Sequence, residues 1–167
     1  MPQTFNVVLN STYCTSETAS NPNTNKNYYI NWSALLPKAE YELTFSFIAK
    51  GNYIQNFTDL PLVNIDMLVQ SNTQQPLASY QASSSNLLGT LFPAYLDPNA
   101  HIAFLRADQS FNPSIYLANR PYSNLINVLI TNGANPPVPW VDETAITPAT
   151  IGAYVMILHF KVLKLHN

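Results

Sequence analysis

Charged side chains are scarce in this chain of 167 residues, because Asp, Glu, Lys and Arg together make up only 10 % of it. Globular proteins usually carry about 25 %. The seven basic and nine acidic residues form no run of either sign and leave a net charge of −2. Nucleic-acid binding needs a concentrated basic face, so we do not expect it. Asn, Ser and Thr replace the missing charge, and such a surface can be buried against neighbours without desolvating many ions. A soluble domain with a polar surface has the same composition.

Cysteine is nearly absent as well. Cys14 is the only one, which excludes an internal disulfide and is typical of a reducing compartment or of a core that needs no covalent link. The first residues, MPQTFNVVLN, lack a basic segment followed by an apolar stretch, so we expect no signal peptide. Glycosylation sequons begin at Asn10, Asn31 and Asn56, but chance matches are expected in a chain this rich in Asn, Ser and Thr.

Helix signals are few. Thirteen prolines are spread through the chain, and helix interiors tolerate proline poorly. The one helical hint is Ser33-ALLPKAE, where Ser33 is expected to cap a single short turn. Glycine occurs only four times, so Asn and Pro carry turns such as Asn21-PNTNKN and Asn132-GANPPVP. No repeat, linker or change of composition divides the chain, which predicts one domain over 1–167.

Strand signals, in contrast, are frequent. Tyr41-ELTFSFIA is the clearest, because its apolar residues alternate with polar ones and predict a strand with one buried face. The predicted inward set is Tyr41, Leu43, Phe45, Phe47 and Ala49. Val63, Ile65, Met67 and Val69 alternate in the same way. Eight main strands are predicted: 4–13, 41–50, 62–70, 86–91, 101–106, 114–119, 124–131 and 153–165, with 28–32 as a ninth, peripheral strand.

Eight strands with irregular connections and no βαβ spacing predict an all-β fold. We expect a single jelly-roll sandwich of about eight antiparallel strands in two sheets. An immunoglobulin-like sandwich fits less well, because the Cys–Trp–Cys framework of that fold is missing.

The C-terminal segment, Gly152-AYVMILHFKVLKLHN, is the most apolar part of the chain. Only six uninterrupted apolar residues run from Ala153 to Leu158, whereas a membrane-spanning helix needs about 20. An amphipathic helix fits poorly too, because no polar face recurs at helical spacing. As a strand, one face is wholly apolar and is predicted to meet the core: Tyr154, Met156, Leu158, Phe160 and Val162. On the other face, Val155 and Ile157 are predicted to point away from the core and still be shielded, by a loop or a neighbouring subunit.

No residue pattern indicates catalysis or metal binding. His101, His159 and His166 lie in separate segments, and Asp142-Glu143 is the one acidic doublet, so neither a metal nor another cofactor is predicted. We interpret His159 as a histidine of a core or interface strand and the doublet as part of a solvated loop. The members of a Ser–His–acid triad meet only in three dimensions, so the sequence does not test for one. The Gly-x-Ser-x-Gly elbow is missing, however, and Cys14 has no basic neighbour that would activate it. We therefore predict no catalytic residue, and a protein that is not an enzyme.

Aromatic residues are plentiful, with ten Tyr, eight Phe and two Trp. Six of them lie in or next to predicted turns: Tyr28, Tyr29, Tyr53, Tyr95, Tyr122 and Trp140. Tyr122 and Trp140 are the candidate contact residues, because aromatic rings beside Asn and Ser suit contacts with a protein or a sugar ring. Each of these tyrosines fits equally well as cover for an end of the sandwich.

Four stretches in this order resemble the small single jelly-roll capsid proteins, of the minor capsid or penton type, of nucleocytoplasmic large DNA viruses. They are Asn27-YYINWSALLP, Tyr41-ELTFSFIA, Asn119-RPYSNLINVLI and Ala153-YVMILHFKVL. The resemblance covers most of the chain and rests on strand patterns rather than chemical signatures. It implies a virion protein that is assembled in the host cytoplasm. It also implies a homo-oligomer, pentamer or trimer, that contacts other capsid proteins; no catalytic residue comes with it.

A second interpretation of the same sequence is a carbohydrate-binding jelly roll, a lectin or fibre-head module that would hold a glycan with Tyr122 and Trp140. A third, an enzyme on a β sandwich such as a cupin, needs clustered histidine ligands, and the scattered histidines speak against it.

Overall fold

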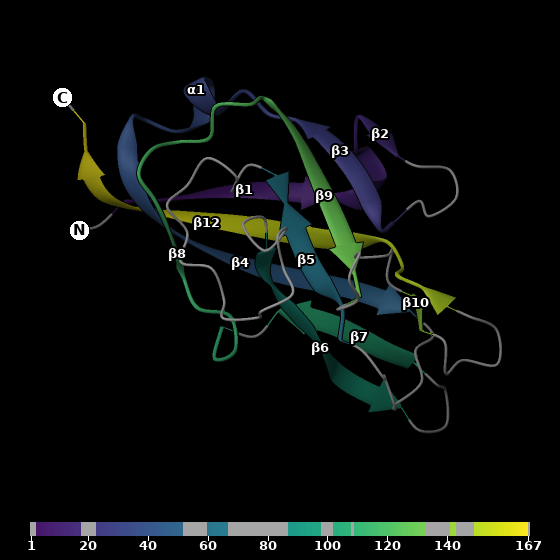
Figure 1. Cartoon of the computed structure of the whole chain (residues 1–167). Helices are drawn as coiled ribbons and strands as arrows, with labels where there is room; N and C mark the ends of the chain where they lie inside the picture. Colours follow the sequence, from purple (N-terminus) through teal and green to yellow (C-terminus); the bar gives the residue numbers. More distant parts are fainter. Residues whose placement is uncertain are drawn as a thin grey trace.

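The fold is built almost entirely of β-strands, as the computed structural model in Figure 1 shows. The structure describes residues 3–17, 23–51, 60–66, 87–97, 102–107, 109–132, 141–142 and 149–166. The elements are β1 (Thr4–Asn10), the 3-10 helix η1 (Ser11–Tyr13), β2 (Ser16–Glu17), β3 (Asn25–Tyr29), α1 (Trp32–Leu35), β4 (Ala39–Gly51), β5 (Leu62–Ile65), β6 (Leu87–Asp97), β7 (Ile102–Ala107), β8 (Ile115–Leu117), β9 (Leu125–Thr131), β10 (Val141–Asp142), β11 (Ala149–Thr150) and β12 (Tyr154–Leu165).

Among these described residues, ten strands form one sheet in the order β1-β12-β4-β7-β6-β5-β9-β3-β2, with β8 paired to β4 beside β7. The strands β10 and β11 form a separate ribbon. Every strand pair is antiparallel. The all-β, antiparallel prediction is confirmed.

The curled sheet has two layers, and β6 joins them. One layer contains β1, β12, β4 and β7, and the other contains β5, β9, β3 and β2. Residues 87–90 of this strand pair with β5, whereas residues 91–97 pair with β7, so one strand passes from one layer to the other. In Figure 1, β5 and β9 cross in front of β1 and β12. The prediction of two separate sheets is therefore not confirmed, because the described strands make one sheet that curls on itself and encloses the core.

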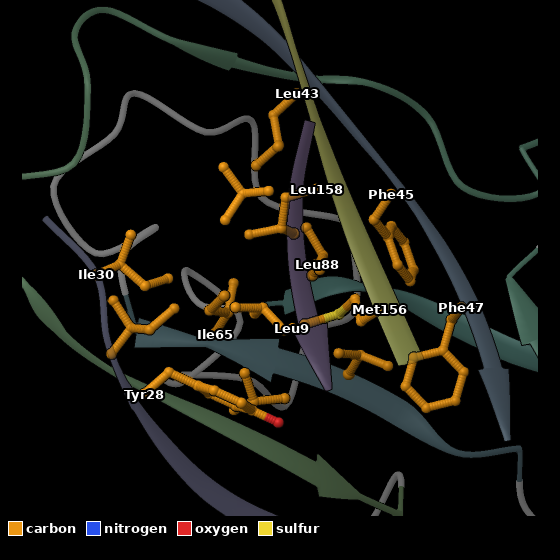
Figure 2. Close-up of a cluster of buried hydrophobic side chains, with 14 of the residues drawn as sticks. Leu9, Tyr28, Ile30, Leu43, Phe45, Phe47, Ile65, Leu88, Met156 and Leu158 are labelled. Carbon is orange, nitrogen blue, oxygen red and sulfur yellow. The ribbon is translucent and has the colours of Figure 1, made fainter. Parts of the chain in front are cut away.

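The core is made by side chains that alternate along each strand. The five residues predicted to face inward from β4, from Tyr41 to Ala49, are all buried. On β5 the same holds for Val63 and Ile65, whereas residues 67–70 of that predicted strand lie outside the described residues. Figure 2 shows the side chains of β4 and β12 meeting those of β3 and β5 in one apolar cluster.

The C-terminal segment is a strand, β12, held between β1 and β4. Its predicted inward face is buried from Tyr154 to Phe160, and Val162 packs against the core in part. Val155 and Ile157 lie on the opposite face and are half-buried within this chain. Their shielding by a neighbouring subunit stays a prediction. Within the described residues, no helix is long and apolar enough to cross a membrane.

Two predicted segments are corrected. The strand predicted over 4–13 ends at Asn10, because the Asn10 side chain accepts a hydrogen bond from Thr12 N at 2.9 Å and starts η1. The peripheral strand predicted over 28–32 is β3, which ends at Tyr29 and lies between β9 and β2.

The helix cap predicted at Ser33 is wrong. The N-cap of α1 is Asn31, and Ser33 lies inside the turn, where its hydroxyl donates to Asn31 Oδ1 at 2.8 Å. Trp32 begins the helix and is buried, so burial of this large side chain sets where the turn starts.

Candidate functional site

The two ends of the sheet differ in how well they are protected. One end is β2, which has only two residues. Short strands and charged side chains are common protection against pairing with another chain. The other end is β1, which has seven residues without charge or proline, in continuous register with β12. This edge carries none of those protective features.

The backbone of β1 offers hydrogen-bonding groups to the outside. Gln3 O accepts a hydrogen bond from Val162 N at 2.8 Å, which fixes the alternation along the pair. In an antiparallel ladder the next residues direct their N–H and C=O groups to the other side. The even-numbered residues from Thr4 to Asn10 therefore face the open edge, where no described strand pairs with β1.

An apolar groove of about 630 Å³ lies beside this edge, between β1 and the stretch formed by β3 and α1. Val8 is 60 % exposed, Tyr13 82 % and Tyr29 66 %, and all three line it. Leu35 adds a half-exposed side chain on the far side. Clustered exposed apolar side chains mark interaction surfaces more often than single ones do. We name this region the β1 groove.

Local contacts hold the wall of the β1 groove that β3 and α1 form. Thr15 Oγ1 accepts from Tyr29 N at 3.1 Å, which ties the segment after η1 to β3. Further along the same wall, the Trp32 indole N–H donates to Ser123 O at 2.8 Å and anchors α1. Because Trp32 is buried and anchored, the short helix presents Leu35 to the groove.

Beneath the groove, the hydroxyl of Tyr28 donates to that of Tyr154 at 3.2 Å. Burial raises the pKa of Tyr28 to about 12, against a smaller lowering by its hydrogen bond with Tyr154. Burial raises the pKa of Tyr154 still more strongly, and Tyr28 beside it acts in the same direction. Both phenols therefore stay neutral at neutral pH, and the groove has an uncharged base.

The structure does not bring the two predicted contact aromatics together. Tyr122 is 73 % exposed in the loop between β8 and β9 and is not part of the β1 groove. Trp140 lies outside the described residues, as do Tyr53 and His101. Tyr28, also predicted to lie at a turn, is buried within β3.

The remaining polar candidates are separated. His159 lies on β12, a strand whose inward face is buried in the core, and its own side chain faces away from the core and is half-buried. Asp142 pairs with Ala149 in the ribbon of β10 and β11 rather than lying in a loop. Cys14 packs against the core in part. Within the part of the chain that the structure describes, no group of three or more His, Cys, Asp or Glu side chains could hold a metal ion.

The groove residues Val8, Tyr13 and Leu35 escaped prediction from the sequence. One signal was present: Val7 and Val8 are adjacent, so in a strand one of them must face outward. Which segment lies beside the outward residue, here β3, depends on how the sheet curls, and the sequence does not show this.

Comparison with known proteins finds no family model, no curated protein and no solved structure that matches this chain.

Proposed function

We propose that the protein is a structural component of a viral shell, of the minor capsid or penton kind, which works by associating with copies of itself and with other shell proteins. The β1 groove carries the proposal: a seven-residue neutral edge strand lies next to exposed apolar side chains. The sequence resemblance to single jelly-roll capsid proteins supplies the class of assembly.

The order of strand pairing supports a jelly roll. Setting aside the short strands β2, β8, β10 and β11, the first strand pairs with the last (β1 with β12) and the second with the second-last (β3 with β9). The third and sixth pair next (β4 with β7), then the two innermost (β5 with β6). A long antiparallel ribbon that is rolled up gives this nested order. The pairs β4 with β12 and β5 with β9 are those that rolling adds, and the remaining pair, β6 with β7, joins the two layers.

A second copy of this chain is the occupant we propose for the β1 groove. An open edge is completed by another strand, because only a strand satisfies its whole row of N–H and C=O groups. The β1 strand has no charged residue, so two copies meet there without repulsion between like charges. Val8 and Tyr29 would lose water on contact, which favours association by about 25 cal/mol per Å² of apolar surface.

The decisive experiment measures molar mass by light scattering over a range of protein concentrations. The wild-type chain is expected to form an oligomer, and Val8→Lys, which adds a charge to the open edge, is expected to shift it to monomer. Leu165→Lys is the matched control, because Leu165 is an apolar side chain about as exposed as Val8 but lies at the C-terminal end of β12 and does not line the β1 groove. A wild-type chain that stays monomeric at every concentration contradicts self-association.

Images of the wild-type oligomer then separate the two kinds of shell protein. A five-fold ring supports a penton, and a three-fold cluster supports a minor capsid protein.

A carbohydrate-binding role is the second candidate, and the exposure of Tyr122 is the observation that favours it. A glycan array tests it with the wild-type chain and Tyr122→Ala. Binding that Tyr122→Ala abolishes supports this role, and an array without any bound glycan contradicts it.

A further inference from the structure

Three polar side chains from three neighbouring strands form a hydrogen-bonded chain on the outer face of the sheet. His159 of β12 lies between Asn6 of β1 and Ser46 of β4. The Asn6 Oδ1 to His159 Nδ1 distance is 2.9 Å, and the His159 Nε2 to Ser46 Oγ distance is 2.8 Å. These residues face away from the core, since their neighbours Val7, Phe45 and Phe160 are buried.

The strand register explains why the three meet. Asn6 lies directly opposite His159, and His159 lies directly opposite Thr44. Ser46 is two residues beyond Thr44 on the same face, at the diagonal position that a long side chain reaches across an antiparallel pair.

The partners of the imidazole decide which nitrogen carries the proton. An amide oxygen only accepts hydrogen bonds, so Asn6 Oδ1 places the proton on His159 Nδ1. His159 Nε2 is then left as the acceptor for the hydroxyl proton of Ser46. A serine becomes nucleophilic when a base in this state lies within hydrogen-bond distance and a third group orients that base.

The surroundings shelter this serine in part. Ser46 and His159 are half-buried, and Ile157 lies directly opposite Ser46 in register. His159 also lines a pocket of about 310 Å³, together with Thr44 and Gln109, whereas Ser46 is not one of its lining residues.

We propose that Ser46 is an activated nucleophile that accepts acyl groups from small carboxylic esters, with His159 as its general base and Asn6 as the residue that positions the imidazole. Ser46 Oγ attacks the carbonyl carbon while its proton passes to His159 Nε2. The new bond joins Oγ to the acyl carbon. The bond to the leaving oxygen then breaks, and that oxygen takes the proton from His159. Water releases the acid by the reverse proton path.

The site is separate from the β1 groove, so the two proposals fail independently. Association is measured as molar mass, whereas acylation is measured as covalent modification of one serine and needs no second copy. A purely structural hydrogen-bond chain would tie β1, β12 and β4 together but would not react with esters.

The test treats the folded full chain with a fluorophosphonate probe, and peptide mass spectrometry locates the modified residue. The Ser46 oxygen displaces fluoride from phosphorus, and its proton leaves through His159. Modification at Ser46 is expected in the wild-type chain and is expected to disappear in Ser46→Ala. Without its general base, His159→Ala should react roughly 10²-fold more slowly or worse. Ser33→Ala is the matched control and should react like the wild type, because Ser33 lies in α1 and its hydroxyl donates to Asn31 Oδ1 rather than to a histidine.

Asn6→Asp separates positioning from simple structural support. A carboxylate still accepts from Nδ1 and adds a negative charge that stabilises the imidazolium, so this variant should react at least as fast as the wild type. Steady release of p-nitrophenol from p-nitrophenyl acetate, lost in Ser46→Ala, extends the result to esters. Two outcomes overturn the proposal: a wild-type chain left unmodified at Ser46, or His159→Ala reacting as fast as the wild type while circular dichroism shows both folded.

Discussion

The hydroxyls of Tyr28 and Tyr154 lie 3.2 Å apart in the protein interior, although the two residues are 126 positions apart in the chain. Tyr28 belongs to β3 and Tyr154 to β12, so this hydrogen bond links two strands that do not pair with each other. The Tyr154 ring also stacks on Phe47 of β4, with ring centroids 4.9 Å apart. One polar contact thus joins the two layers at the base of the β1 groove.

This pair predicts loss of stability at alkaline pH. The pKa of Tyr28 is raised from 10.0 to about 12, and that of Tyr154 is raised more strongly, chiefly because burial penalises the phenolate. Below about pH 10 the phenols are protonated in both the folded and the unfolded chain. As the pH rises toward 12, only the unfolded chain releases these protons, so the free energy of unfolding falls.

Urea unfolding at a series of pH values from about 8 to about 12 measures that slope. Replacing both tyrosines, as Tyr28→Phe/Tyr154→Phe, removes the two titrating groups and should make the slope shallower. An unchanged slope in the double variant contradicts the assignment.

The single variant Tyr154→Phe should destabilise the protein more than its small change in volume suggests. It removes the acceptor of the Tyr28 hydroxyl and leaves a buried donor unpaired, at a cost of about 1–3 kcal/mol. Adding Tyr28→Phe removes that unpaired donor, so the double variant should be less destabilised than the sum of the two single variants. A double-mutant cycle by urea unfolding checks this, and strict additivity would show that the two hydroxyls do not interact.

Gly89 is predicted to be intolerant of any side chain. It lies on β6 opposite Val63, and a Cβ at this position would be 2.7 Å from Phe45 Cε1 and would collide with Asn112 Oδ1. The Asn112 amide cannot move away cheaply, because its oxygen accepts from Thr90 N at 2.7 Å and its nitrogen donates to Thr90 O at 2.9 Å. Gly89→Ala should therefore cost about 1–3 kcal/mol.

Thermal unfolding of Gly89→Ala measures this cost. The companion variant Gly89→Ala/Asn112→Gly removes the colliding amide together with its two hydrogen bonds. If Gly89→Ala unfolds like the wild type, the close packing between β6 and the Asn112 segment is not present in solution.

The sequence predicted features that depend on a single strand. The inward faces of β4 and β12 followed from the alternation of their own side chains, because the core selects every second residue. Features that depend on pairing between distant strands were not predictable in this way. Nothing in residues 87–97 signals that the two halves of β6 pair with different neighbours. The contact of His159 with Ser46 likewise depends on the register between β12 and β4, because the two residues are 113 positions apart in the sequence. The N-cap of α1 is Asn31 and not the predicted Ser33, because burial of Trp32 outweighed the local preference of serine for a cap position.

Two leucines of β12, Leu158 and Leu163, differ in the direction of their side chains and should differ in their contribution to stability. Leu158 is fully buried, whereas Leu163 is about half-exposed near the end of the strand. Leu158→Ala removes apolar contacts and leaves a cavity that the packed core fills only in part, so it should cost about 2–5 kcal/mol. Leu163→Ala has little to lose and should stay within about 0.5 kcal/mol of the wild type. Urea unfolding of both variants measures the difference. Both variants replace a leucine of the same strand by alanine, so the change in strand propensity cancels when their free energies of unfolding are compared. Equal losses of stability would contradict the placement of β12 with one face in the core.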